Sequence, residues 1–125
     1  MSMNPAIPLP PVMIKVTETG EASSKTIQVQ VIQDPINLTG QGRGPVPIKW
    51  DIDPTSTAGW SFAANGIVID SPSNKFGNDG PANGNKRYGW TRNRDQADGQ
   101  FYKYSISVTN GATTVIVDPI IINEP

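Results

Sequence analysis

The residues from Phe101 onward constrain the fold most strongly, because they form two apolar runs joined by a turn sequence. Apolar and polar side chains alternate from Phe101 to Val108, and a second apolar run follows from Thr113 to Asn123. Such a period of two is typical of a strand with one buried face. Asn110-Gly111 lies between the runs and favours a type I′ hairpin turn, since both central residues of that turn need positive φ. We therefore expect a β-hairpin here.

Strands are expected along most of the remaining chain, and helices are not. The sequence contains 12 Gly and 12 Pro. Every window of eleven or more residues with helical apolar spacing is interrupted by one of them. The seven predicted strands are residues 12–17, 27–32, 48–53, 60–62, 67–69, 101–108 and 113–123. Asn65-Gly66 is expected to turn the chain between the fourth and fifth of these, and Pro119 to mark a bulge or a change of sheet edge in the last.

The length of 125 residues fits one domain. We expect a Pro-rich extended arm over residues 1–11 and a single β-sandwich domain over residues 12–125. Its core should be formed by the alternating apolar positions of the longest strands, namely Ile14, Val29, Val31, Ile48, Trp50, Tyr104, Ile106 and Val115.

Residues 70–99 differ from the rest, because Asn and Gly are frequent there and aliphatic side chains are scarce. Thirty residues without a strand would be unusual in a compact domain. We therefore expect part of the segment, residues 87–91, to pair as an edge strand.

Two resemblances follow from these patterns. The segment Asp98-Gly99-Gln100-Phe101-Tyr102, with a single Trp in the third predicted strand, resembles an immunoglobulin-like β-sandwich with Greek-key connections. The resemblance implies that Tyr102 forms a tyrosine corner, with its hydroxyl bonded to the backbone of the preceding loop. It also places Tyr104 where antibody domains carry their second Cys. Since this chain has no disulfide, Trp50, Tyr104 and Ile106 should fill that space.

The second resemblance rests on the end of the chain, Val117-Asp118-Pro119-Ile120-Ile121-Ile122-Asn123-Glu124-Pro125. It is similar to small bacterial proteins of the DP-EP family, which take their name from their Asp-Pro and Glu-Pro pairs. This resemblance implies a bacterial protein and supplies no activity.

Composition excludes several kinds of chemistry. The chain has no Cys and no His, which rules out disulfides, thiolate metal sites and Ser-His-Asp triads. The net charge is −1, so nucleic acid is not an expected partner. No apolar run approaches a membrane span, and residues 1–11 lack the pattern of a signal peptide, so a cytoplasmic location without membrane contact is expected.

The sharpest local candidate site is the run from Lys86 to Arg94, in which four cations are interleaved with two aromatic residues. Such a pattern could contact a ligand by stacking and by charge. The candidate contact residues are Arg87, Tyr88, Trp90, Arg92 and Arg94. The alternative is an edge strand whose aromatic rings pack inward and whose cations face water.

Carboxylates offer two further candidates. Asp51 and Asp53 could act as a glycosidase pair, although acids on the wet face of a strand are ordinary. A calcium site would need oxygen ligands such as those of Asp51, Asp53, Asp70, Asn74, Asn78 and Asp79. Their spacing matches no calcium loop, and capping of turns by these side chains is the simpler explanation.

We therefore expect a non-enzymatic module without a cofactor, which binds a partner or assembles with itself into a homo-oligomer through terminal arms or edge strands. Its partner could also be a carbohydrate or a protein ligand. A carbohydrate-binding module would use Trp60, Tyr88 or Trp90 as platforms, and a hydrolase would use the Asp carboxylates.

Overall fold

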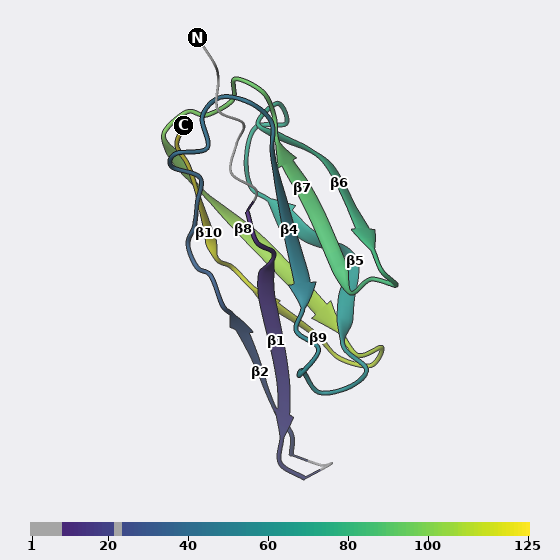
Figure 1. Cartoon of the computed structure of the whole chain (residues 1–125). Helices are drawn as coiled ribbons and strands as arrows, with labels where there is room; N and C mark the ends of the chain where they lie inside the picture. Colours follow the sequence, from purple (N-terminus) through teal and green to yellow (C-terminus); the bar gives the residue numbers. More distant parts are fainter. Residues whose placement is uncertain (1–8, 22–23) are drawn as a thin grey trace.

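The computed structural model describes residues 9–21 and 24–125, and these residues form strands and turns only. Two mixed sheets pack face to face, so the all-β prediction is confirmed (Figure 1). Most of the arm predicted over residues 1–11 lies outside the described residues. Within the described part of the chain, no helix is long and apolar enough to cross a membrane.

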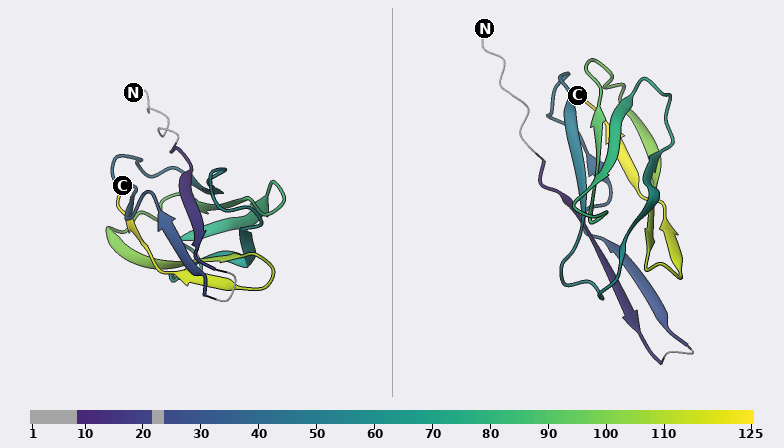
Figure 2. Two further views of the ribbon diagram at one scale, coloured as in Figure 1. Left: turned by 90° about the horizontal axis from the view of Figure 1, so that it is seen from below. Right: turned by 90° about the vertical axis from the view of Figure 1, so that its right-hand side faces the viewer.

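The first sheet has the strand order β2-β1-β4-β7-β6. Its strands are β1 (Val12–Thr19), β2 (Thr26–Val31), β4 (Val46–Ile52), β6 (Phe76–Ala82) and β7 (Arg87–Arg92). Neighbouring strands are antiparallel except β1 and β4, which run parallel. The hairpin of β1 and β2 extends beyond the rest of the sandwich (Figure 2).

The second sheet has the order β3-β10-β8-β5, and β9 also pairs with β8. Its strands are β3 (Ile36–Asn37), β5 (Ser61–Ile69), β8 (Gln100–Thr109), β9 (Thr114–Val117) and β10 (Ile120–Asn123). The described residues thus form ten strands rather than about seven. Four strands are added, by the short β3, by β6 and β7 in the segment 70–99, and by the division of the last run into β9 and β10. One is lost, because the strands predicted over 60–62 and 67–69 form the single strand β5.

Two predicted turns or breaks are wrong. Asn65-Gly66 does not separate two strands; it lies in a bulge within β5, between the pairs Phe62↔Val108 and Ile67↔Ile106. Pro119 causes no bulge, and the strands on either side of it, β9 and β10, both pair with β8. The register continues from Ile106↔Val117 to Lys103↔Ile120, and the Tyr104 N–H donates to the Pro119 carbonyl.

The hairpin predicted at Asn110-Gly111 is present, but its turn differs. Only Gly111 has positive φ, and the loop has four residues because Thr109 pairs with Thr114. The Asn110 side-chain oxygen accepts the N–H groups of Ala112 and Thr113, at 2.9 and 2.8 Å. The four-residue loop is stabilised by this side-chain cap, and its Asn110 does not have the positive φ that a type I′ turn would require.

The position of β7 also corrects the prediction for residues 87–91. The strand forms, but it lies between β4 and β6 and is therefore interior, whereas β6 is the edge. The sequence of β6 conceals it, because FGNDGPA contains no aliphatic alternation.

Alternation predicted the core well. Ile14, Ile48, Trp50, Tyr104 and Ile106 are all buried. Val29, Val31 and Val115 are only partly buried, because they lie on the edge strand β2 and on β9.

The two sheets meet at an aromatic pair. Trp50 on β4 and Tyr104 on β8 have ring centroids 5.5 Å apart, and the indole Nε1–H donates to the Tyr104 hydroxyl at 3.2 Å. Burial raises the pKa of Tyr104 well above its usual value, so the hydroxyl stays neutral at physiological pH.

Trp50→Ala should lower the free energy of unfolding by about 3–5 kcal/mol, because it leaves a large cavity between the sheets. Chemical denaturation measures this value. Lys49→Ala, at the exposed neighbouring position, serves as the control and should change stability by about 0.5 kcal/mol or less. Equal stability of the two variants would remove Trp50 from its central role.

Candidate functional site

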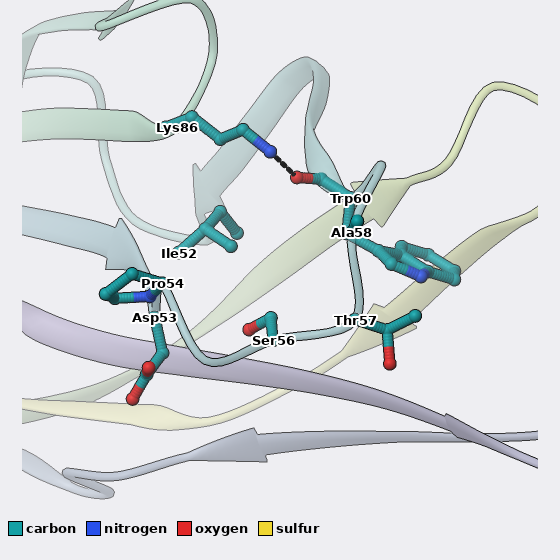
Figure 3. A pocket seen from close by; sticks show the side chains of 8 residues that line it. All are labelled: Ile52, Asp53, Pro54, Ser56, Thr57, Ala58, Trp60 and Lys86. Atoms are coloured by element: carbon teal, nitrogen blue, oxygen red, sulfur yellow. Dashed lines mark hydrogen bonds between the residues drawn. The ribbon is translucent and has the colours of Figure 1, made fainter.

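A pocket of about 370 Å³ opens beside the end of β4 (Figure 3). The segment that follows β4 forms one wall, and Lys86, next to the start of β7, approaches from the other side. Its lining residues are Ile52, Asp53, Pro54, Ser56, Thr57, Ala58, Trp60 and Lys86.

The wall of the pocket is held in place by β1. Asp53 N–H donates to the Ile14 carbonyl and Thr57 N–H to the Val16 carbonyl, at 2.7 and 2.8 Å. In return, the Ser56 hydroxyl accepts the Val16 N–H at 3.0 Å. The segment therefore continues the parallel pairing of β1 with β4 after β4 has ended.

The polar groups of the pocket are largely engaged within the protein. The Lys86 ammonium donates to the Trp60 carbonyl, and the Asp53 carboxylate accepts both the N–H and the hydroxyl of Thr55. The Thr55 hydroxyl, and then its N–H, lower the pKa of Asp53, which suits a turn cap better than a general acid. In the described residues, no carboxylate lies within hydrogen-bonding distance of the Ser56 or Thr57 hydroxyl. The pocket could hold a small ligand, but it assembles no acid–base pair.

Glu18 stabilises the Trp60 side of this pocket, and the sequence did not indicate its role. Its carboxylate accepts from the Trp60 indole at 2.8 Å, from Asn110 at 3.2 Å and from Lys25 at 3.2 Å. The hydrogen bond from Lys25 lowers the pKa of Glu18 most, and the bonds from Trp60 and Asn110 lower it further. One side chain thus joins β1 to the start of β5 and to the loop before β9.

The five predicted contact residues are not brought to one surface. Tyr88, Trp90 and Arg92 share the inward face of β7, and Tyr88 and Arg92 are buried. Trp90 is partly buried and donates its Nε1–H to the Ile67 carbonyl at 2.9 Å. Arg87 lies on the opposite face, in an ion pair with Asp51 at 2.6 Å, and Arg94 is exposed in the loop beyond the strand.

Arg92 is buried and hydrogen-bonded within the fold. The edge-strand alternative, in which the cations of this run face water, is therefore wrong for Arg92. Its guanidinium donates to the carbonyls of Gly42 at 2.6 Å and Glu124 at 3.2 Å, and to the Asn123 side chain at 3.3 Å. Burial lowers the pKa of Arg92, while Asp98 opposes the shift. Arginine suits this position because its planar fork of donors can satisfy several acceptors at once. It thereby joins the glycine-rich loop to the end of the chain.

The Tyr102 hydroxyl reaches the loop before its strand, as predicted, but it bonds the Asp98 carboxylate rather than a backbone group. Asp98 also accepts from Gln100 N–H at 3.0 Å and from the Asn123 amide at 3.1 Å. Burial raises the pKa of Asp98, but these three bonds outweigh it and the net shift is downward. Burial, followed by the bond to Asp98, raises the pKa of Tyr102 to about 12.

The acidic candidates are also dispersed. Asp51 is paired with Arg87, and Asp79 accepts the Tyr88 hydroxyl at 3.3 Å. In residues 9–21 and 24–125, no group of three or more acidic side chains is positioned to hold a metal ion.

The largest exposed apolar side chains lie mainly on the outer face of the second sheet. Phe101, Ile116 and Val68 are 66%, 60% and 48% exposed. Ile122 lies opposite Phe101, and Ile120 lies opposite Lys103, on the same face and partly buried. These residues, Val68, Phe101, Ile116, Ile120 and Ile122, are called the outer apolar face below. The alternation of 101–108 predicted that Phe101 points away from the core, but sequence could not show that three strands add to it.

No family model matches the chain, and a search of curated proteins finds no match. The resemblance to DP-EP proteins stays a prediction.

Tyr102→Phe should lower the free energy of unfolding by about 1–3 kcal/mol at neutral pH, because Asp98 loses a donor. The pKa of Tyr102 is raised on folding from 10.0 to about 12, so the bond contributes fully below pH 10 and is lost between pH 10 and 12. The difference in stability between wild type and variant should therefore shrink over that interval. A constant difference from neutral pH to pH 12 would contradict this assignment.

Proposed function

We propose that this chain is a non-enzymatic, immunoglobulin-like β-sandwich module that assembles with itself through the outer apolar face. The single observation that carries the proposal is the exposure of Phe101 and Ile116, at 66% and 60%, on a regular sheet surface. On the same face Ile122 lies opposite Phe101 and Ile120 lies opposite Lys103. Exposed apolar side chains grouped on one face of a folded domain mark sites of association.

The distribution of strands supports the immunoglobulin-like part of the proposal. β4, β7 and β6 are neighbours in one sheet, and β5, β8 and β10 belong to the other. In immunoglobulin sandwiches, strands B, E and D are neighbours in one sheet, and strands C, F and G form the other. β4, β7 and β6 then correspond to B, E and D, and β5, β8 and β10 correspond to C, F and G. In this assignment β1 is an additional strand, inserted between β2 and β4. Trp50 and Tyr104 then occupy strands B and F, which carry the inter-sheet disulfide in antibody domains.

A second copy of the chain is the partner that the outer apolar face fits best. The face carries charges of both signs, since Lys103 lies beside the apolar residues and the Asp70 N–H donates to the Lys103 carbonyl at 2.9 Å. Asp118 is exposed between β9 and β10. A two-fold contact places the same patch on both partners, so a patch with both signs can complement itself.

Self-association is better supported than carbohydrate binding. A carbohydrate platform needs exposed aromatic rings in the segment 70–99, where Phe76 and Tyr88 are 3% and 2% exposed. Trp60 is buried as well, and Trp90 is partly buried with its Nε1–H bonded to the Ile67 carbonyl.

Phe101→Glu should weaken self-association by about tenfold or more, because a charge would enter the apolar contact beside Ile122. Light scattering over a series of micromolar concentrations measures the mass. The control is Ala82→Glu, which adds the same charge at an exposed position of β6. The average mass of the wild type and of the control should exceed the 13.4 kDa of a single chain. At the same concentrations, the average mass of the Phe101→Glu variant should be lower than theirs. A wild type of 13.4 kDa throughout the series would contradict the proposed function.

A further inference from the structure

β2 is the free edge of the first sheet (Figure 1). In an edge strand, alternate residues direct their backbone N–H and C=O groups away from the neighbouring strand. Ile32 N–H donates to the Met13 carbonyl at 3.0 Å, whereas the Ile14 and Val16 carbonyls accept from the segment after β4. The backbone N–H and C=O groups of the odd-numbered residues of β1 therefore point toward β2. Because bonded and non-bonded pairs alternate along an antiparallel ladder, Gln28 and Gln30 bond to β1.

The outward backbone groups of β2 thus belong to Ile27, Val29 and Val31. Within the described residues, their N–H and C=O groups have no hydrogen-bond partner. A row of such groups is a template for another strand.

The other exposed strands are protected against such pairing. β6 has a register shift between Gly77 and Gly80 and contains Pro81. β5 is interrupted by its bulge after Phe62, β3 has two residues, and β9 ends before Pro119. Bulges, prolines and short lengths are the usual means of blunting an edge. β2, with the sequence TIQVQV, has none of them.

We propose that β2 pairs antiparallel with β2 of a second copy of this chain, in a two-fold contact centred on Val29. In this register Val29 lies opposite Val29 of the second copy, and Ile27 lies opposite Val31. All three outward residues then fall at hydrogen-bonded positions, which gives about six backbone bonds across the contact.

The side chains of β2 suit this register. Gln28 lies opposite Gln30 of the second copy, and Thr26 lies opposite Ile32, which is 54% exposed in the single chain. Pairing would therefore cover an apolar side chain that the fold leaves uncovered. No like charges meet, since Lys25 lies opposite Gln33 and next to Asp34 of the second copy. The β1–β2 hairpin also extends beyond the rest of the sandwich (Figure 2).

This inference rests on the proposed self-assembly and adds a second contact to it. A chain with two different two-fold contacts, at the outer apolar face and at β2, forms assemblies larger than a dimer. Blocking either contact alone should leave dimers held by the other.

The test combines charge variants at β2 with Phe101→Glu, which blocks the other contact. In the Phe101→Glu background the chain should remain a dimer by light scattering. Adding Gln28→Lys with Gln30→Lys places like charges opposite each other across the contact and should raise Kd by about tenfold or more. Gln28→Glu with Gln30→Glu should do the same, and an equimolar mixture of the two charge variants should restore the dimer. The control pair, Ser73→Lys with Ala82→Lys, adds the same charge at exposed positions outside β2.

The outcomes separate the two proposals. A monomeric Phe101→Glu variant from an associating wild type would overturn the β2 contact and leave the proposed function standing. Dimers that persist in both charge variants would also overturn the β2 contact. Loss of the dimer without recovery on mixing would overturn the antiparallel register. A monomeric wild type would overturn both proposals.

Discussion

The contact between Trp50 and Tyr104 joins the two sheets at the centre of the sandwich, and the other interactions between sheets are arranged around it. With no cysteine in the chain, this space must be filled by side chains instead of a disulfide. An aromatic pair buries a large area, and a hydrogen bond between the rings satisfies the polar atom that each brings into the core. Packing of this kind depends on shape, so the alternating residues of β4 and β8 must keep their register.

Polar side chains extend the same arrangement toward the ends of the molecule. At one end Arg92 connects β7 with the Gly42 loop and the last residues of the chain, and Tyr102 bonds Asp98 beside it. Toward the other end Glu18 joins β1, Trp60 and Asn110. These contacts fasten the loops to the sheets. The described residues also present the free edge of β2 and the outer apolar face, and features of these two kinds suit association.

Alternation of apolar and polar residues indicates the face of a strand on which each side chain lies, and this is the part of the structure that it predicted. It located β1, β2, β4 and β8 and the buried positions Trp50 and Tyr104. It could not report which strand lies beside which, so the interior position of β7 was missed. The ligand site expected on Arg87, Tyr88 and Arg92 was not assembled for the same reason, since β7 has no free edge and places alternate side chains in the core. Asn65-Gly66 and Asn110-Gly111 show a related limit, because the same dipeptide occurs in a bulge and in a capped four-residue loop.

The most specific claim about association is that β2 of one copy pairs with β2 of another, and amide hydrogen exchange at β2 addresses this contact residue by residue. The outward amides of Ile27, Val29 and Val31 can be protected only by a partner, whereas those of Gln28 and Gln30 are protected within each chain. Pairing of β2 with β2 should slow exchange at the three outward amides as protein concentration rises, while exchange at Gln28 and Gln30 stays slow throughout. Fast exchange at Ile27, Val29 and Val31 at every concentration would contradict it.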